Sequence, residues 1–303
     1  MRLAIAVAIA AAAVASCGHK PPPAPVDDGD ASEDTFAASA KFKPVAFAVH
    51  VKGTEGARPI ILIPGLGCPG SVWDETVAHL AGDHEAHVLT LAGFAGLPAI
   101  KEPLSRAVRR DLTRYIRAKK LVDPIIVGHS MGGFIAYWLA SYHPELVGPT
   151  IIVDAGPALS GDLDEAKALR KQWKNASDEE FAATTRMVFM SMTTDPRRME
   201  PVLAGVVKSD RAAIGNAVYE MMTTDLTEKV EEIKAPVLVL AADGGYQKRI
   251  RAQVAPIADH EVIVVPRAKH FVMFDDPPAF FRAIDKFLAD HPAKKKRKPA
   301  SAE

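Results

Sequence analysis

Short runs of apolar residues recur between residues 45 and 265, separated by amphipathic or glycine-rich stretches. A continuous apolar run of about four to eight residues is typical of a strand buried on both faces, as in a parallel sheet. The first run instead alternates large and small or polar residues, which also favours a strand. The pattern predicts strands at residues 45–51, 59–63, 87–91, 125–127, 149–154, 236–243 and 261–265.

Apolar residues at helical spacing follow several of these runs. They predict helices at residues 71–80, 104–121, 134–142 and 278–288. The alternation of strands and helices stops at residues 156–230, where the pattern predicts helices throughout. Six of the nine methionines fall there: Met187, Met190, Met192, Met199, Met221 and Met222. Methionine adapts to irregular apolar surfaces, so we predict a helical cap over an apolar pocket, although core packing explains any single methionine.

The central run ends in Gly128-His129-Ser130-Met131-Gly132, with a helical pattern directly after it. A strand, a Gly-x-Ser-x-Gly turn and a helix together form a nucleophile elbow, which raises the serine hydroxyl above the sheet edge. Gly128 and Gly132 leave room for the sharp turn. Ser130 is therefore the candidate nucleophile, and its alternative role is that of a helix cap. The neighbouring His129 is expected to point elsewhere.

The two ends of the chain differ from its middle. Arg2 precedes a short apolar run that ends at Cys17, too short for the roughly 20 residues that span a bilayer. We predict a signal peptide at residues 1–17, of lipoprotein type with a lipid on Cys17; an ordinary cleaved signal peptide is the alternative. Residues 18–40, rich in proline and aspartate, predict a tether, and residues 292–303 a basic, disordered tail.

Composition narrows the classes of function. The 303 residues carry a formal net charge of +0 and are 48% hydrophobic, which suits one large core and argues against nucleic acid as the main partner. The two cysteines, Cys17 and Cys68, predict neither a disulfide framework nor a zinc site. Cys68 is expected to be a small buried residue. No motif indicates a metal, nucleotide or flavin, so we expect no cofactor.

Over residues 42–291 the chain resembles the serine α/β-hydrolase superfamily, particularly its lidded small-ester hydrolases. Three motifs carry the resemblance, in the family's order: Pro64-Gly65-Leu66-Gly67, the Ser130 elbow and the loop around His270. The resemblance implies an α/β fold with an eight-stranded, mostly parallel sheet flanked by helices. The core is expected at residues 41–155 and 231–291, and the cap at residues 156–230.

The resemblance also implies a catalytic machinery. His270 follows the last predicted strand and is the expected base for Ser130, while the backbone N–H groups of Leu66 and Met131 are the expected oxyanion donors. The acid departs from the family pattern. Asp243 comes early after its strand and Asp154 ends another strand, so both are candidates and Asp243 is slightly preferred.

The expected reaction is hydrolysis of a small, apolar carboxylic ester through an acyl-enzyme on the serine. An aminopeptidase, a lactonase or a haloperoxidase-like activity are alternatives on the same fold. The unusual acid also leaves open a non-catalytic surface or binding protein. A lipid on Cys17 would make the protein an exported bacterial lipoprotein of the periplasmic face or cell envelope, retained at the outer membrane because Gly18 follows the cysteine. Its oligomeric state stays open.

Overall fold

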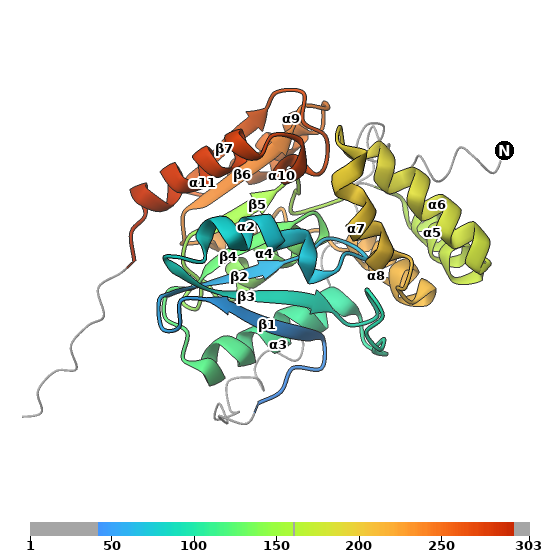
Figure 1. Cartoon of the computed structure of the whole chain (residues 1–303), viewed down its shortest axis with the longest axis horizontal. Coiled ribbons are helices and arrows are strands. Elements are labelled where there is room, and N and C mark those ends of the chain that lie inside the picture. Colours follow the sequence, from blue (N-terminus) through green and yellow to red (C-terminus); the bar gives the residue numbers. More distant parts are fainter. Residues whose placement is uncertain (1–41, 160, 294–303) are drawn as a thin grey trace, which may run out of the picture.

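The computed structural model describes residues 42–159 and 161–293, which form one seven-stranded sheet in the order β1-β3-β2-β4-β5-β6-β7 (Figure 1). β1 pairs antiparallel with β3, and every other neighbouring pair is parallel. The strands are β1 (Phe47–Gly53), β2 (Arg58–Ile63), β3 (His84–Leu91), β4 (Ile125–His129), β5 (Thr150–Val153), β6 (Val237–Ala242) and β7 (His260–Val265). The predicted α/β-hydrolase fold class is confirmed.

The strand count corrects the expectation of eight strands. An eight-stranded sheet would need two strands before β2, and the described residues 42–57 hold a single strand of 7 residues. That strand also starts two residues later than predicted. The N–H groups of Val45 and Ala46 both donate to Asp111 Oδ2, at 2.8 and 3.0 Å, and so do not join the sheet.

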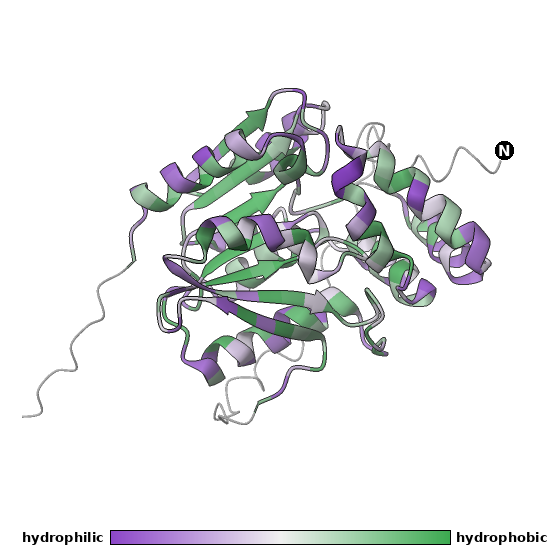
Figure 2. Cartoon of the chain, viewed as in Figure 1, coloured by the Kyte–Doolittle hydropathy of each residue, from purple (hydrophilic) through white to green (hydrophobic). Residues whose placement is uncertain are grey.

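Both faces of the sheet are covered, which explains the continuous apolar runs. Ile61 and Ile63 pack into one buried cluster with α3 (Leu104–Lys119), α4 (Met131–Tyr142) and α9 (Gln247–Val254). Ile60 and Leu62 point the other way, toward α2 (Asp74–Leu80) and α11 (Pro277–Asp290). Alternate residues of a strand face opposite sides, so a strand covered on both faces, such as β6, is apolar throughout. In Figure 2 the strands β5 and β6 are mostly green, whereas the helices around the sheet carry both purple and green residues.

The segment between β5 and β6 holds four longer helices, which we call the cap: α5 (Leu163–Asn175), α6 (Asp178–Ser191), α7 (Pro196–Val206) and α8 (Arg211–Thr223). The cap lies at one side of the sheet in Figure 1. Glu220 of α8 fastens it to the core, because its carboxylate accepts bonds of 2.8 and 3.0 Å from the N–H groups of Ser105 and Arg106 at the start of α3. Burial raises the pKa of this carboxyl group.

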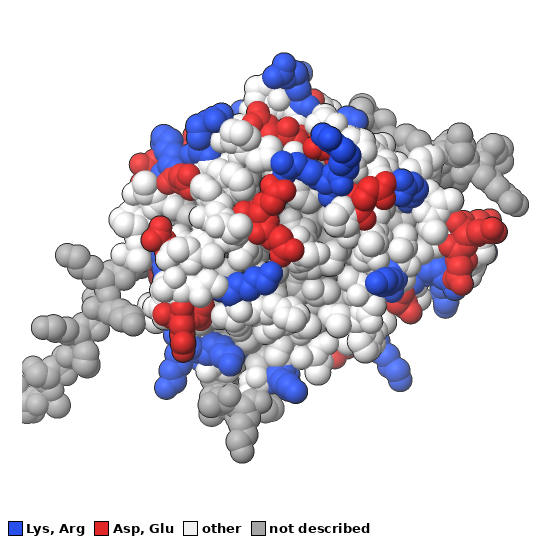
Figure 3. Space-filling view, in the orientation of Figure 1, with Lys and Arg blue, Asp and Glu red and all other residues white. Residues whose placement is uncertain are grey.

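The remaining elements are short: η2 (Gly70–Trp73), η3 (Val230–Glu232) and α10 (Val272–Asp275). Acidic and basic side chains are interspersed on the face seen in Figure 3. Within residues 42–159 and 161–293, no helix is both long and apolar enough to cross a membrane. The predicted signal peptide, Cys17, the tether and most of the basic tail lie outside the described residues.

Candidate active site

The turn between β4 and α4 holds Ser130 in a strained conformation. Its φ of 53° and ψ of −120° lie in a region that residues with a side chain rarely adopt. Its N–H donates to Val153 O at 2.9 Å, which ties the turn to β5. A Cβ on Gly128 would lie 2.3 Å from Gly132 O, and one on Gly132 would lie 2.2 Å from Ile63 O. The two glycines therefore permit the elbow that presents Ser130 to the cavity.

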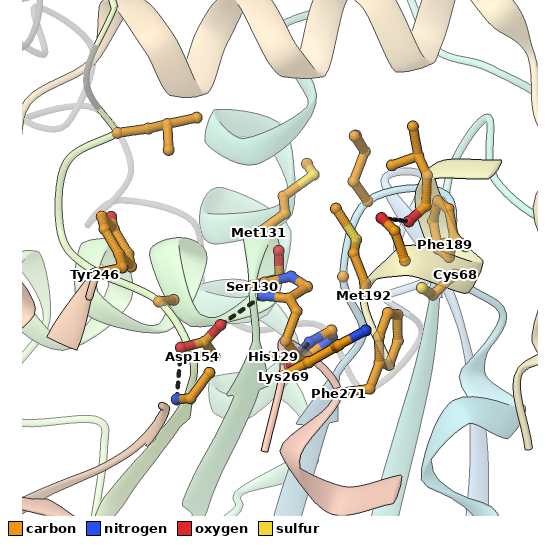
Figure 4. Close-up of a pocket in the computed structure, with 18 of the residues that line it drawn as sticks. Cys68, His129, Ser130, Met131, Asp154, Phe189, Met192, Tyr246, Lys269 and Phe271 are labelled. Atoms are coloured by element: carbon orange, nitrogen blue, oxygen red, sulfur yellow. Dashed lines mark hydrogen bonds and ion pairs between the residues drawn. The ribbon is translucent and has the colours of Figure 1, made fainter. Parts of the chain in front are cut away.

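His270 lies on the loop after β7 and lines the same cavity as Ser130. Its Nδ1 is 2.7 Å from Asp154 Oδ2, so the ring is held by a carboxylate. Figure 4 shows Ser130 and Asp154 on either side of the ring to which the dashed line from Asp154 leads. A Nδ1–H donor in this bond leaves Nε2 as the basic nitrogen of the ring.

Asp154 is fixed on the end of β5. Its N–H donates to Leu240 O at 2.8 Å, and its Oδ1 accepts from Ala242 N at 2.9 Å, so both strand-end contacts come from β6. The residue is buried and has a φ of 45°, a left-handed conformation for a residue with a side chain. A strained, buried carboxylate with each oxygen bonded is typical of an acid that orients a histidine.

The slight preference for Asp243 disagrees with this geometry. Asp243 is exposed, and its Oδ2 accepts from the backbone N–H of Arg267 at 3.1 Å. Its own N–H donates to Ala268 O at 2.9 Å, so Asp243 braces the turn that precedes His270. Because β6 ends at Ala242, Asp243 comes directly after the strand and reaches this turn instead of the imidazole.

The two predicted oxyanion donors, Leu66 and Met131, both line the cavity. Met131 opens α4, and the first N–H groups of a helix have no partner within it. No backbone bond of the described residues uses the Leu66 N–H. The N–H groups of Leu66 and Met131 are therefore available to a bound ligand, and their role as oxyanion donors stays a prediction.

The cavity has a volume of about 310 Å³. Its apolar lining comes from the core and from all four cap helices: Leu66, Phe134, Trp173, Phe181, Val188, Phe189, Met192, Val206, Ile214 and Met221. Two of the six cap methionines, Met192 and Met221, belong to this lining. Met187 is 40% exposed and Met199 is buried in the core, so aromatic and aliphatic side chains form most of the wall that the methionine content predicts.

Cys68 also lines the cavity, as a buried thiol. Burial raises the pKa of this thiol to about 12. Because the thiolate is the reactive form, the group stays inert near neutral pH. Cys68 therefore packs as a small apolar residue, as expected from the sequence.

His129 has a role that the sequence interpretation missed. Its Nε2 lies 3.1 Å from the carbonyl oxygen of His270, and its ring packs 4.7 Å from the ring of Phe271. The pKa of His129 lies well below its ordinary value. Burial of the ring is the main cause, and the nearby His270 is a smaller one. A neutral ring that donates from Nε2 satisfies this bond, so His129 supports the backbone of the base loop. The adjacency of two histidine positions in space cannot be seen in the sequence.

The chain is similar to known hydrolases in sequence and in fold. The profile of the alpha/beta hydrolase family matches residues 60–284. The pimeloyl-(acyl-carrier protein) methyl ester esterase of Edwardsiella ictaluri is 24% identical over 249 residues, which covers 77% of this chain and 93% of that protein. A thermophilic esterase from Thermogutta terrifontis superposes with a TM-score of 0.71 and 21% identity, over 81% of this chain and 94% of its own.

A second solved structure is the enol-lactonase from Burkholderia xenovorans, with a TM-score of 0.69, 20% identity and coverage of 80% of this chain and 96% of its own. These structural likenesses establish the fold, which hosts many reactions. The family profile spans more than half of the chain and includes the elbow, the strand end of Asp154 and the loop of His270. The chain therefore belongs to the alpha/beta hydrolase family of enzymes.

Proposed function

We propose that this protein hydrolyses carboxylic esters with small, apolar acyl groups through an acyl-enzyme intermediate. The observation that carries the proposal is the 2.7 Å bond between His270 Nδ1 and Asp154 Oδ2, in a cavity shared with Ser130. A carboxylate that holds one ring nitrogen keeps the other nitrogen available as a base for the serine hydroxyl. The strained elbow of Ser130 supplies the nucleophile.

In this mechanism Ser130 Oγ attacks the ester carbonyl and His270 Nε2 takes the hydroxyl proton. Asp154 stabilises the resulting imidazolium without taking the proton. The N–H groups of Leu66 and Met131 bind the oxyanion. The intermediate collapses, and His270 returns the proton to the departing alcohol. Water then attacks the acyl group with His270 again as the base, which releases the acid and restores Ser130.

The cavity supports an apolar acyl group as substrate. Its walls are mostly aromatic and aliphatic, and pockets of this kind bind by burying apolar surface. Relatives named as methyl ester esterase and thermophilic esterase support an ester bond as the target. The likeness to an enol-lactonase favours including a lactone, a cyclic ester, in the substrate panel.

The experiment is hydrolysis of a nitrophenyl ester series, together with labelling by a fluorophosphonate probe. Ser130→Ala should abolish labelling and lower kcat by about 10⁶-fold, and His270→Ala should have a similar effect on kcat. The double variant should be little worse than either single variant, because the two residues act as a unit. A wild-type protein that is neither labelled nor active on esters or lactones would instead support the non-catalytic alternative.

We also propose that the protein is exported and anchored by a lipid on Cys17. The sequence Val14-Ala15-Ser16-Cys17 at the end of the apolar run, followed by the proline-rich tether, supports this. One lipid-modified cysteine at the mature N-terminus would place the enzyme at the periplasmic face or cell envelope. The intact mass of the exported protein tests it.

A further inference from the structure

The loop that carries His270 is joined to the cap by a set of hydrogen bonds centred on Asp275. Asp275 Oδ1 accepts from Thr193 Oγ1 at 2.7 Å and from Thr194 N at 2.7 Å. Its Oδ2 accepts from Lys269 N at 2.6 Å. Thr193 and Thr194 lie in the turn between α6 and α7, so one carboxylate binds the cap and the base loop together.

The backbone on both sides of His270 is fixed by these contacts. The N–H before it, on Lys269, donates to Asp275, and the N–H after it, on Phe271, donates to Met192 O at 3.2 Å. The carbonyl of His270 itself receives the bond from His129 Nε2 at 3.1 Å. The peptide groups around the imidazole are thereby held by α10, by the cap and by the strand that precedes Ser130.

The same cap turn also forms part of the acyl cavity. The side chain of Met192 lines the cavity while its carbonyl binds the base loop, and Figure 4 shows Met192 beside Phe271 and Lys269. Lys269 Nζ adds a bond of 3.3 Å to Thr193 O. The wall that contacts the acyl group and the support of the base are therefore one connected structure.

We propose that Asp275 is a positioning residue for His270, acting by holding the base loop against the α6–α7 turn of the cap. The proposal rests on the ester hydrolysis inferred above. It makes the cap part of the support of the base as well as a cover for the substrate. A loop that carries a general base must place it within a fraction of an ångström, since a misplacement of about 1 Å can cost about 10²-fold in rate.

Asp275→Asn is the sharpest test because the side chain keeps its shape and loses one acceptor. The carboxylate receives backbone N–H groups on both oxygens, from Thr194 and from Lys269. An asparagine amide places its NH₂ against one of them, whichever way it is oriented, so one of these two bonds is lost. The matched control is Asp276→Asn: Asp276 caps α11 through Ala279 N at 3.0 Å, and asparagine caps as well as aspartate.

The measurements are kcat and KM on a nitrophenyl ester, with kcat expressed per serine that a fluorophosphonate titrates. Asp275→Asn should lower kcat and the labelling rate constant by about 10- to 100-fold with a change in KM below about threefold, while Asp276→Asn keeps the wild-type values. A merely destabilising change would reduce the fraction of titratable serine, and kcat per titrated serine would stay constant.

Thr193→Val provides a second variant, which leaves the carboxylate in place and removes the bond from Thr193 Oγ1 to Asp275, together with the bond that Thr193 Oγ1 accepts from Asp195 N. It should lower kcat in the same direction by a smaller factor, and it serves if Asp275→Asn does not fold. The inference is overturned if Asp275→Asn matches Asp276→Asn, or if its effect falls on KM alone. If Ser130 of the wild-type protein is not labelled, the proposed function fails, and the inference about Asp275 fails with it. If the wild-type protein is labelled and active but Asp275→Asn has no effect, only the inference about Asp275 fails.

Discussion

If the proposed ester hydrolysis holds, individual side chains of the cap should set how far the acyl group of a substrate can extend. Met221 lines the cavity and is nearly buried, whereas Met187 is 40% exposed and absent from the lining. The two residues are of one type and come from one cap, which makes them a matched pair. The contribution of the cavity wall to substrate binding can therefore be separated from general effects of changing a methionine.

Met221→Ala should lower kcat/KM for short-chain esters by roughly 3- to 10-fold and move the optimum to longer chains. Burying one methylene group contributes about 0.8 kcal/mol. The shorter alanine side chain leaves space that a short acyl group does not fill and a longer one does. Met187→Ala should leave the profile unchanged. The measurement is kcat/KM from nitrophenyl acetate to octanoate; a flat profile that neither variant alters would contradict an apolar acyl site.

At this scale the sequence predicted Ser130 and His270 as candidates because each adjoins a recognisable strand end. It slightly preferred Asp243 and kept Asp154 as the alternative, since each ends a buried apolar run and both strands adjoin the site. The two aspartates differ in their hydrogen-bond partners. The Asp154 carboxylate bonds to the imidazole of His270, whereas the Asp243 carboxylate accepts from the backbone N–H of Arg267. Such contacts depend on the loop after β7, whose path no pattern in the sequence describes.

The strand–elbow–helix unit is the element on which the account depends. Its turn is tight enough that any Cβ on Gly128 would overlap the backbone of Gly132, at 2.3 Å. Backbone atoms cannot rotate away as a flexible side chain can. The unit should therefore be far more sensitive to a small substitution than a glycine such as Gly82, where a Cβ meets nothing within 4 Å.

Gly128→Ala should destabilise the protein by about 1–3 kcal/mol through overpacking and reduce labelling of Ser130. In a domain of this size, each kcal/mol of lost unfolding free energy lowers Tm by roughly 2–4 °C, so thermal melts can measure the shift. Gly82→Ala is the control, since a Cβ there meets nothing within 4 Å. Equal Tm values and equal labelling of the two variants would show that the elbow is not as tight as described.

Most elements were predictable because buried strands and amphipathic helices have distinct periods. The strands β2 and β4 to β7 start or end within a few residues of the predicted ranges. The helices α9 and α10 were missed. α9 buries only Ile250 and Val254 among polar neighbours, and α10 has only 4 residues, too few to show a period. α10 carries Asp275 at its end, so the contact that joins the base loop to the cap could not be foreseen.

At the scale of the whole molecule, the enzyme core and the N-terminal end, for which we propose export, are separate parts of the chain. The core and cap account for residues 42–159 and 161–293, and the proposed ester hydrolysis concerns these residues. The apolar N-terminal run, Cys17 and the tether concern where that chemistry takes place. The geometry of the core and the N-terminal sequence are independent features, so ester hydrolysis and export can be tested separately.

The mature protein from bacterial membranes should begin at Cys17 and carry a diacylglyceryl group there, visible in the intact mass. Cys17→Ser should prevent this modification and release the protein from the membrane fraction, because the apolar anchor is lost. Cys68→Ser, at a buried site beside the cavity, should not change the mass shift or the fractionation. A Cys17→Ser protein that is processed and retained as before would contradict the lipid anchor.

The central claim is that Asp154 is the acid of a Ser130–His270–Asp154 triad, and one pair of variants tests it most directly. Asp154→Asn should lower kcat by roughly 10³- to 10⁴-fold with the fold intact by thermal melt, because the amide no longer orients the correct form of the histidine. Asp243→Asn should change kcat little, since its amide oxygen can still accept from Arg267 N. If Asp243→Asn is inactive while Asp154→Asn keeps the wild-type kcat, Asp154 is not the acid of the triad.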